Sequence, residues 1–242
     1  MKLSQQAASL ERAKERAKAM RFGYCERLDA GFWAEPFNAV TNAAFLVAAL
    51  AGLLLWRRAG GRDYLVLALI LLLFAIGIGS FLFHTMPNGW TLMADVVPIQ
   101  LFAFGYFAFA LRRYFGASGL VTAAGTLAFF GLALALSWAG RAFLPAPASG
   151  SAGYAAFVLG LFGMATALPR RPALRPQKKL LALAGVAFAV SLTIRSIDFA
   201  VCAGLPLGTH WLWHLLNALV LYWLLRAAVL SEPAIRPTRA GA

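Results

Sequence analysis

Long apolar segments separated by short polar connections recur along almost the whole chain. Seven such segments can be recognised, at 38–56, 64–84, 92–111, 119–138, 152–168, 179–201 and 210–229. About 20 apolar residues allow a helix to cross the ~30 Å hydrocarbon core of a bilayer. Spanning segments must satisfy their backbone hydrogen bonds internally, and no period-two alternation indicates a β-barrel. The pattern therefore predicts an all-α membrane protein, a bundle of seven transmembrane helices.

The composition agrees with this architecture and divides the chain into three parts. Hydrophobic residues make up 61% of the 242 residues, and the mean hydropathy is +0.73, which excludes an ordinary soluble domain. One domain, residues 24–230, contains all seven segments. Residues 1–23 are predicted to form a polar lead-in helix, because Glu11 and Glu15 each precede a lysine by three residues. Residues 231–242 are predicted to be a flexible tail.

The net charge of +13 comes from basic residues in the connections rather than from one patch with interleaved aromatic residues, so no nucleic-acid partner is expected. Alternate connections are basic, whereas those on the other side carry only Arg141. The positive-inside rule then places the C-terminus in the cytoplasm and the N-terminus outside, although the basic N-terminal segment opposes this orientation. The residues that set it are Arg57, Arg58, Arg62, Arg112, Arg113, Arg170, Arg171, Arg175, Lys178, Lys179, Arg226, Arg236 and Arg239.

All three histidines of the chain, His84, His210 and His214, lie at ends of apolar segments. His210 and His214 are one helical turn apart and share a face. Ionisable groups at membrane depth usually mark functional sites. Three neutral imidazoles with a fourth position open to water are the ligand set of a catalytic zinc ion, so a Zn²⁺ site is predicted. The alternative for each histidine alone is an interfacial position.

Ser80 and Asp95 should lie at the same membrane level as the histidines. Ser80 is one turn before His84, and Asp95 opens the third segment after a short connection. Alone, Asp95 could be a helix cap and Ser80 a small packing residue. Together with the histidines, they favour a catalytic site.

Two charges lie inside the sixth segment, Arg195 and Asp198. We expect an intrahelical pair that neutralises both charges. The other interpretation is that Asp198 orients a ligand histidine through its second ring nitrogen.

Acidic residues and one cysteine precede the first segment. Glu26, Asp29 and Glu35 offer the oxygen ligands that calcium prefers, and the alternative is salt bridging to Arg21 and Arg27. The two cysteines, Cys25 and Cys202, fall on the outer side in the expected topology, where a disulfide is permitted. We therefore predict a bridge between them.

The order of these motifs resembles that of the alkaline ceramidases, within a superfamily of seven-helix membrane hydrolases that also includes the adiponectin and progestin receptors. The similarity covers residues 23–228. The resemblance implies zinc on His84, His210 and His214, with Ser80 and Asp95 beside the metal water, and calcium on Glu26 and Glu35, with Asp29 as a substitute ligand. The motifs that carry it are Cys-Glu, Glu-Pro-Phe-Asn-Ala-Val-Thr-Asn, Gly-Ser-Phe-Leu-Phe-His, Asp-Val-Val-Pro, Arg-Ser-Ile-Asp and His-Trp-Leu-Trp-His.

The expected function is that of a zinc-dependent lipid amide hydrolase that cleaves ceramide to a fatty acid and sphingosine by attack of zinc-bound water. Asp95 would act as general base and then general acid, and Ser80 would donate to the oxyanion. The alternatives are another N-acyl lipid as substrate, or a receptor-like lipid sensor with a structural zinc. The alanine- and arginine-rich composition indicates a bacterial inner-membrane protein with its site facing the periplasm. The sequence does not indicate an oligomeric state.

Overall fold

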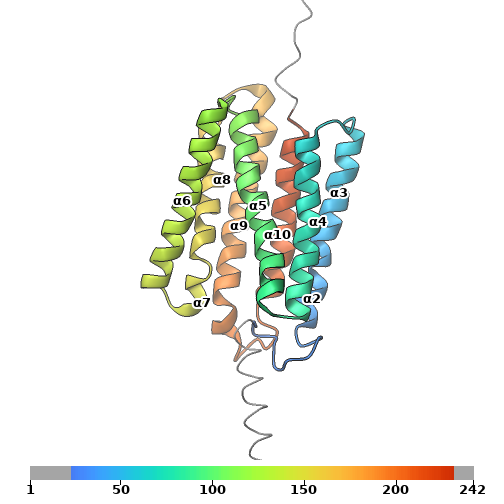
Figure 1. Ribbon diagram of the computed structural model, residues 1–242, viewed down its shortest axis with the longest axis vertical. Helices are drawn as coiled ribbons and strands as arrows, with labels where there is room; N and C mark the ends of the chain where they lie inside the picture. The colour runs from blue at the N-terminus through green and yellow to red at the C-terminus, as the bar shows by residue number, and fades with distance from the viewer. Residues whose placement is uncertain (1–22, 232–242) are drawn as a thin grey trace, which may run out of the picture.

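The computed structural model describes residues 23–231, so nearly all of the predicted lead-in helix (1–23) and tail (231–242) lies outside the described residues. In this part of the chain there are helices and no strands. Figure 1 shows the long helices running side by side. In chain order they are α2 (Pro36–Thr41), α3 (Ala43–Arg58), α4 (Tyr64–Thr85), α5 (Gly89–Arg113), α6 (Gly119–Phe143), α7 (Ala146–Ser149), α8 (Ala155–Ala167), α9 (Arg175–Val201) and α10 (His210–Val229), with 3-10 turns η1 (Ala152–Tyr154) and η2 (Pro172–Leu174).

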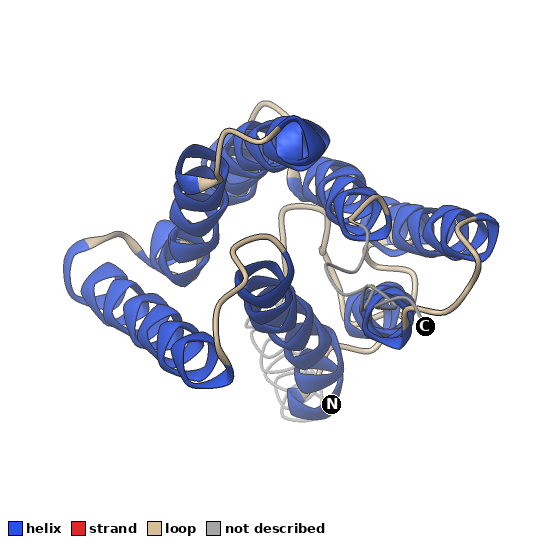
Figure 2. Cartoon of the chain, turned by 90° about the horizontal axis from the view of Figure 1, so that it is seen from above, coloured by secondary structure: helices blue, strands red, loops and turns tan. Residues whose placement is uncertain are grey.

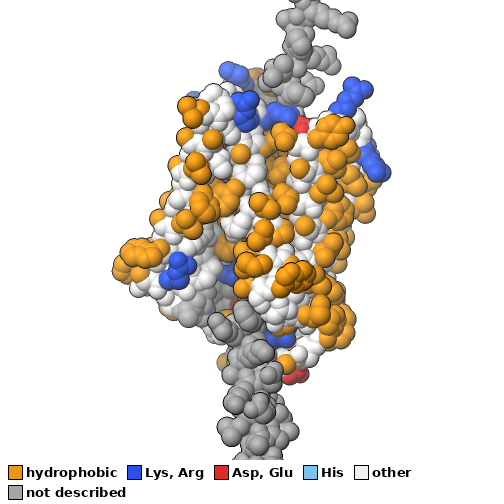
Figure 3. All heavy atoms as spheres, viewed as in Figure 1, with side chains coloured by type: hydrophobic (Ala, Val, Ile, Leu, Met, Phe, Trp, Pro, Cys, Tyr) orange, Lys and Arg blue, Asp and Glu red, His pale blue; other side chains and the backbone are white. Residues whose placement is uncertain are grey.

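The predicted all-helical membrane architecture is confirmed. Within the described residues, 6 helical spans are long and apolar enough to cross a bilayer, and the first joins α2 and α3 into Pro36–Arg58. The remaining predicted span, 152–168, is a shorter apolar helix, Ala152–Ala167. Apolar side chains cover the face seen in Figure 3, and Lys and Arg gather towards one end. Exposed residues such as Leu71, Leu127 and Val186 are suited to contact lipid.

The long helices close into a ring, seen from above in Figure 2. Each of α3, α4, α5, α6, α8 and α9 packs against the next in this series, α9 packs against α10, and α10 returns to α3. The last helix of the chain therefore lies beside the first long one. This closure brings residues around 84 and 210, far apart in sequence, to the same end of the bundle.

Helices α4 and α5 approach each other unusually closely at Gly79. A Cβ atom at this position would lie 1.9 Å from the carbonyl oxygen of Ala94, a contact that no side chain could make. The connection between the helices is short because Asn88 caps α5, its side chain accepting from the backbone N–H of Trp90 and Thr91. Ser80 follows Gly79 on α4 and Asp95 follows Ala94 on α5, so both residues lie at this contact.

Candidate metal centre

The three histidines converge at one end of the ring. His84 lies in the last turn of α4, and His210 and His214 lie in the first turns of α10. All three side chains are buried, and one ligand atom from each lies within 4.8 Å of the others. Among the described residues this is the only group of His, Cys, Asp and Glu with that geometry. Three imidazoles gathered in this way could hold one metal ion.

The second ring nitrogens of two histidines have partners that fix the ring orientation. His84 Nδ1 lies 2.5 Å from Glu35 Oε2, and His214 Nδ1 lies 2.9 Å from the Thr41 hydroxyl. In the described part of the chain, His214 Nε2 and His210 Nδ1 are buried without a hydrogen-bond partner. His214 thus shows the division that is general for metal-ligating histidines, with one nitrogen held by an outer partner and the other left for the metal. The residues present therefore fit a zinc ion.

Glu35 acts in the structure as the partner of His84. Its Oε1 also accepts from Arg27 Nε at 2.6 Å, and Arg27 Nη2 in turn donates to the carbonyl oxygen of His84 at 2.6 Å. Asn38 Nδ2 donates to Oε2 at 3.1 Å. Burial opposes ionisation of this carboxyl, but His84 and Arg27 outweigh it and hold the pKa of Glu35 below its ordinary value.

The structure does not support the calcium site, because its three predicted ligands serve separate partners. The Glu26 carboxylate accepts from the backbone N–H of Phe37 at 2.6 Å and of Asn38 at 2.9 Å, at the start of α2. Burial raises the pKa of Glu26, and these two hydrogen bonds counteract the rise. Asp29 is exposed and accepts from the backbone N–H of Gly31. These side chains thus shape the chain before α2 instead of forming a shared oxygen cluster.

Asp198 joins three segments at the buried end of α9. Its carboxylate accepts from the backbone N–H groups of Cys25 (2.9 Å), Thr209 (2.6 Å) and His210 (3.0 Å). Gly208 makes this approach possible, since it has a φ of +61° and a Cβ there would lie 2.1 Å from Asp198 Oδ1. Asp198 therefore positions His210 through the backbone and not through the second ring nitrogen.

The predicted intrahelical pair between Arg195 and Asp198 is wrong. Arg195 Nη1 donates to Ser151 Oγ at 2.6 Å, and Nη2 to the Tyr24 hydroxyl at 3.4 Å. The backbone N–H groups of Cys25, Thr209 and His210 satisfy Asp198 instead. The structure also joins Cys25 and Cys202 by a disulfide, with 5.4 Å between their Cα atoms. This bridge holds the segment before α2 against the end of α9.

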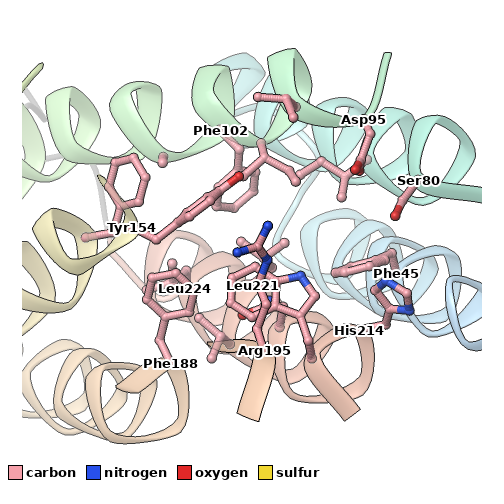
Figure 4. Close-up of a pocket in the computed structure, with 18 of the residues that line it drawn as sticks. Phe45, Ser80, Asp95, Phe102, Tyr154, Phe188, Arg195, His214, Leu221 and Leu224 are labelled. Atoms are coloured by element: carbon pink, nitrogen blue, oxygen red, sulfur yellow. The ribbon is translucent and has the colours of Figure 1, made fainter. Parts of the chain in front are cut away.

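Ser80 and Asp95 face the same cavity as His210 and His214 (Figure 4). Ser80 and Asp95 lie near each other, and Asp95 Oδ1 is buried without a hydrogen-bond partner among the described residues. From this polar end the cavity continues between the helices and is lined by apolar side chains such as Phe102, Met164 and Leu224. His210 and Leu224 both line it and are 14 positions apart on α10, so the cavity extends about 21 Å along that helix.

Several residues at this site were missed or misassigned by sequence reasoning. Tyr24 stacks on His210 with 3.4 Å between ring centroids, and Thr41 and Arg27 support the ligand histidines. No sequence pattern singles out Tyr24 or Thr41, because they act across long separations, whereas Arg27 was a possible salt-bridge partner of the nearby acidic residues. Arg195 did give a signal, as a cation inside an apolar segment, but the nearest acid in sequence is not its partner.

Comparison with known proteins gives one match. A protein-family model described as Ceramidase matches residues 23–232. No curated protein and no solved structure matches the chain.

Proposed function

The chain belongs to the ceramidase family, and on that premise we propose that it is a zinc-dependent intramembrane hydrolase that cleaves ceramide to a fatty acid and sphingosine. Family membership supports hydrolysis of an amide bond in a lipid. One observation carries the finer assignment. Three buried histidines converge, two of them with an unpartnered ring nitrogen and a place in the wall of an apolar cavity, beside a carboxylate oxygen that also lacks a partner among the described residues.

His84, His210 and His214 would hold the zinc ion, leaving a fourth position for water or substrate. When bound, zinc supplies polarisation of the amide carbonyl and lowers the pKa of water towards ~7. Glu35 and Thr41 hold the His84 and His214 rings through their Nδ1 atoms. The Asp198 carboxylate fixes the backbone at His210.

Asp95 is the proposed general base and general acid. Its unpartnered Oδ1 faces the cavity beside the histidines, so it can accept a proton from the attacking water. The same proton then passes to the nitrogen of the leaving amine as the C–N bond breaks. A free carboxylate oxygen is suited to this cycle, whereas a carboxylate with both oxygens occupied is not.

Ser80 is proposed to assist in two successive positions. Its hydroxyl has a single proton, which it can donate to the neighbouring Asp95 carboxylate. Once Asp95 has accepted a proton, its need for this hydrogen bond falls, and Ser80 can donate to the carbonyl oxygen as negative charge develops there. The acyl chain of the substrate would occupy the apolar part of the cavity, among side chains such as Phe102 and Leu224.

We also propose that the site faces the outer side of a bacterial inner membrane. The connections at the end opposite the histidines carry Arg57, Arg112 and Lys178, whereas the histidine end has the disulfide Cys25–Cys202. Basic connections favour the cytoplasm, and a disulfide favours an oxidising compartment.

The test is incubation of purified, zinc-loaded protein with a panel of N-acyl lipids, with products identified by mass spectrometry and bound zinc measured by elemental analysis. His84→Ala, His210→Ala and His214→Ala are expected to lose both zinc and activity. Asp95→Asn is expected to keep zinc and lose turnover by about 10²–10⁴-fold. Asp29→Asn, at an exposed aspartate, is the matched control and should change neither.

Full activity in the histidine variants would contradict the proposal. Bound zinc without cleavage of any N-acyl lipid would also contradict it and favour the receptor-like alternative.

A further inference from the structure

Arg195 is a cation that lies inside a membrane span. It lies in the span Pro172–Val201, and no ion pair involves it within residues 23–231. Its two hydrogen bonds go to the neutral hydroxyls of Ser151 and Tyr24. Buried charges are normally paired, and an intramembrane charge without a partner usually marks a functional site. No acidic side chain within residues 23–231 lies within ion-pair distance of the guanidinium, so it is able to pair with an anionic group of a ligand.

The guanidinium is held in position and directed into the cavity. It lies over the rings of Tyr154 and Trp213, at 5.6 Å and 5.3 Å from their centroids. Figure 4 shows it pointing into the space that Asp95 and Ser80 also face. The two hydrogen bonds occupy two of the five N–H donors of an arginine, which leaves donors for a ligand.

The position of Arg195 connects it to the metal centre. Tyr24 stacks on His210 and accepts from Arg195 Nη2, so a single phenol ring separates the guanidinium from a proposed zinc ligand. Asp95 is the only acid lining the cavity in the described part of the chain, and it makes no ion pair with Arg195. An anionic group held by Arg195 would thus lie close to the amide that reacts at the histidines.

We propose that Arg195 binds a carboxylate of the lipid in this cavity. Arginine presents a planar pair of donors that matches a carboxylate, and such charge-assisted hydrogen bonds are among the stronger ones in proteins. The carboxylate has two sources: the head group of an acidic N-acyl lipid such as an N-acyl amino acid, or the fatty acid that ceramide cleavage releases. Only this choice of sources rests on the proposed hydrolase function, since carboxylate binding itself does not require turnover.

The first arm of the test measures binding without catalysis. Dissociation constants of palmitate and of 1-hexadecanol are measured on full-length protein in detergent, for the wild type, Arg195→Gln and Arg58→Gln. Arg58 is an exposed arginine at the opposite end of the bundle and serves as the matched control. Loss of a charge-assisted hydrogen bond should weaken palmitate binding about tenfold to a hundredfold in Arg195→Gln, with hexadecanol unchanged.

The proposal is overturned if palmitate binding is unaffected in Arg195→Gln, or if both ligands weaken equally, which would assign Arg195 a structural role. If Arg195→Gln does not fold, Arg195→Lys replaces it. Lysine keeps the charge but not the planar pair of donors, so palmitate should weaken severalfold with hexadecanol unchanged. Equal effects on the two ligands would again overturn the proposal.

The second arm identifies the source of the carboxylate. The values of kcat/KM for N-palmitoylglycine and for the neutral N-palmitoylethanolamine are compared in the same variants, together with inhibition by palmitate. A wild-type preference for the glycine conjugate that disappears in Arg195→Gln assigns the carboxylate to the substrate. Equal values of kcat/KM for the two substrates in the wild type, together with weaker inhibition by palmitate in Arg195→Gln, assign the carboxylate to the fatty acid product. If the wild type cleaves no amide, the proposed function fails while the binding arm still decides the role of Arg195.

Discussion

Glu35→Gln tests whether the carboxylate of Glu35 supports the metal site. Glu35 accepts from Arg27 Nε at its Oε1, and its Oε2 lies against His84 Nδ1 and accepts from Asn38 Nδ2. A glutamine of the same shape has one acceptor oxygen, and its NH₂ group would face a donor on one side. Either the Arg27 charge loses its acceptor or the His84 ring loses its orienting partner.

The expected magnitude follows from these contacts. Loss of an outer partner of a ligand histidine typically weakens metal binding 10–100-fold, which corresponds to about 1.4–2.7 kcal/mol. An unpaired buried Arg27 should lower the free energy of unfolding by about 3–5 kcal/mol. Zinc affinity is measured by competition with a chelator, and stability by thermal unfolding with and without zinc.

Glu26→Gln is the matched control, because Glu26 is also buried in the segment before α2 but touches only backbone N–H groups of α2. It should lower stability without a specific loss of zinc affinity. Unchanged zinc binding in Glu35→Gln, or an equal loss in Glu26→Gln, would refute the role of Glu35 as the support of His84.

Two further perturbations test the framework around the site. Gly79→Ala places a methyl group against the carbonyl of Ala94, so it should separate α4 from α5 and reduce turnover at least tenfold, with zinc retained. The control is Gly131→Ala, at a position with open space, which should have no effect in the same activity and metal assays. Cys202→Ser opens a bridge between residues 177 apart, for which the chain-entropy relation gives about 5 kcal/mol, so the variant should unfold at a lower temperature. The unfolding temperature of the variant should also become insensitive to reductant. An unfolding temperature of the wild type that does not change with reductant would count against the bridge.

The fold was largely predictable because a bilayer imposes one requirement on every span. Length and hydrophobicity mark the long helices from α3 to α10, and even the short span 152–168 could be identified as the exception. The face shared by His210 and His214 follows from helical spacing alone. Their meeting with His84 required the further inference that all three lie at one membrane level.

The misassigned residues lie where distant segments replace local partners. Spacing along α9 favoured a pair between Arg195 and Asp198, but the partners of both come from the chain before α2, from Ser151 and from the start of α10. Similarly, the acidity of Glu35 suggested a cation ligand, with salt bridging to Arg27 as the alternative, and only the fold reveals that His84 lies beside it as well. Residue type predicts what a group can bind, while contacts between segments that the fold brings together, up to 173 positions apart for Cys25 and Asp198, decide what it does bind.

The division of the ligands between α4 and α10 has a consequence for biogenesis. Two of the three imidazoles enter the membrane with the last helix of the bundle, long after His84 has been inserted. On the proposed zinc assignment, a nascent chain passes most of its synthesis with only one of the three ligands, so it cannot yet retain the ion. Zinc binding would then occur only after α10 has been inserted, and a chain arrested before α10 should emerge from the translocon without zinc.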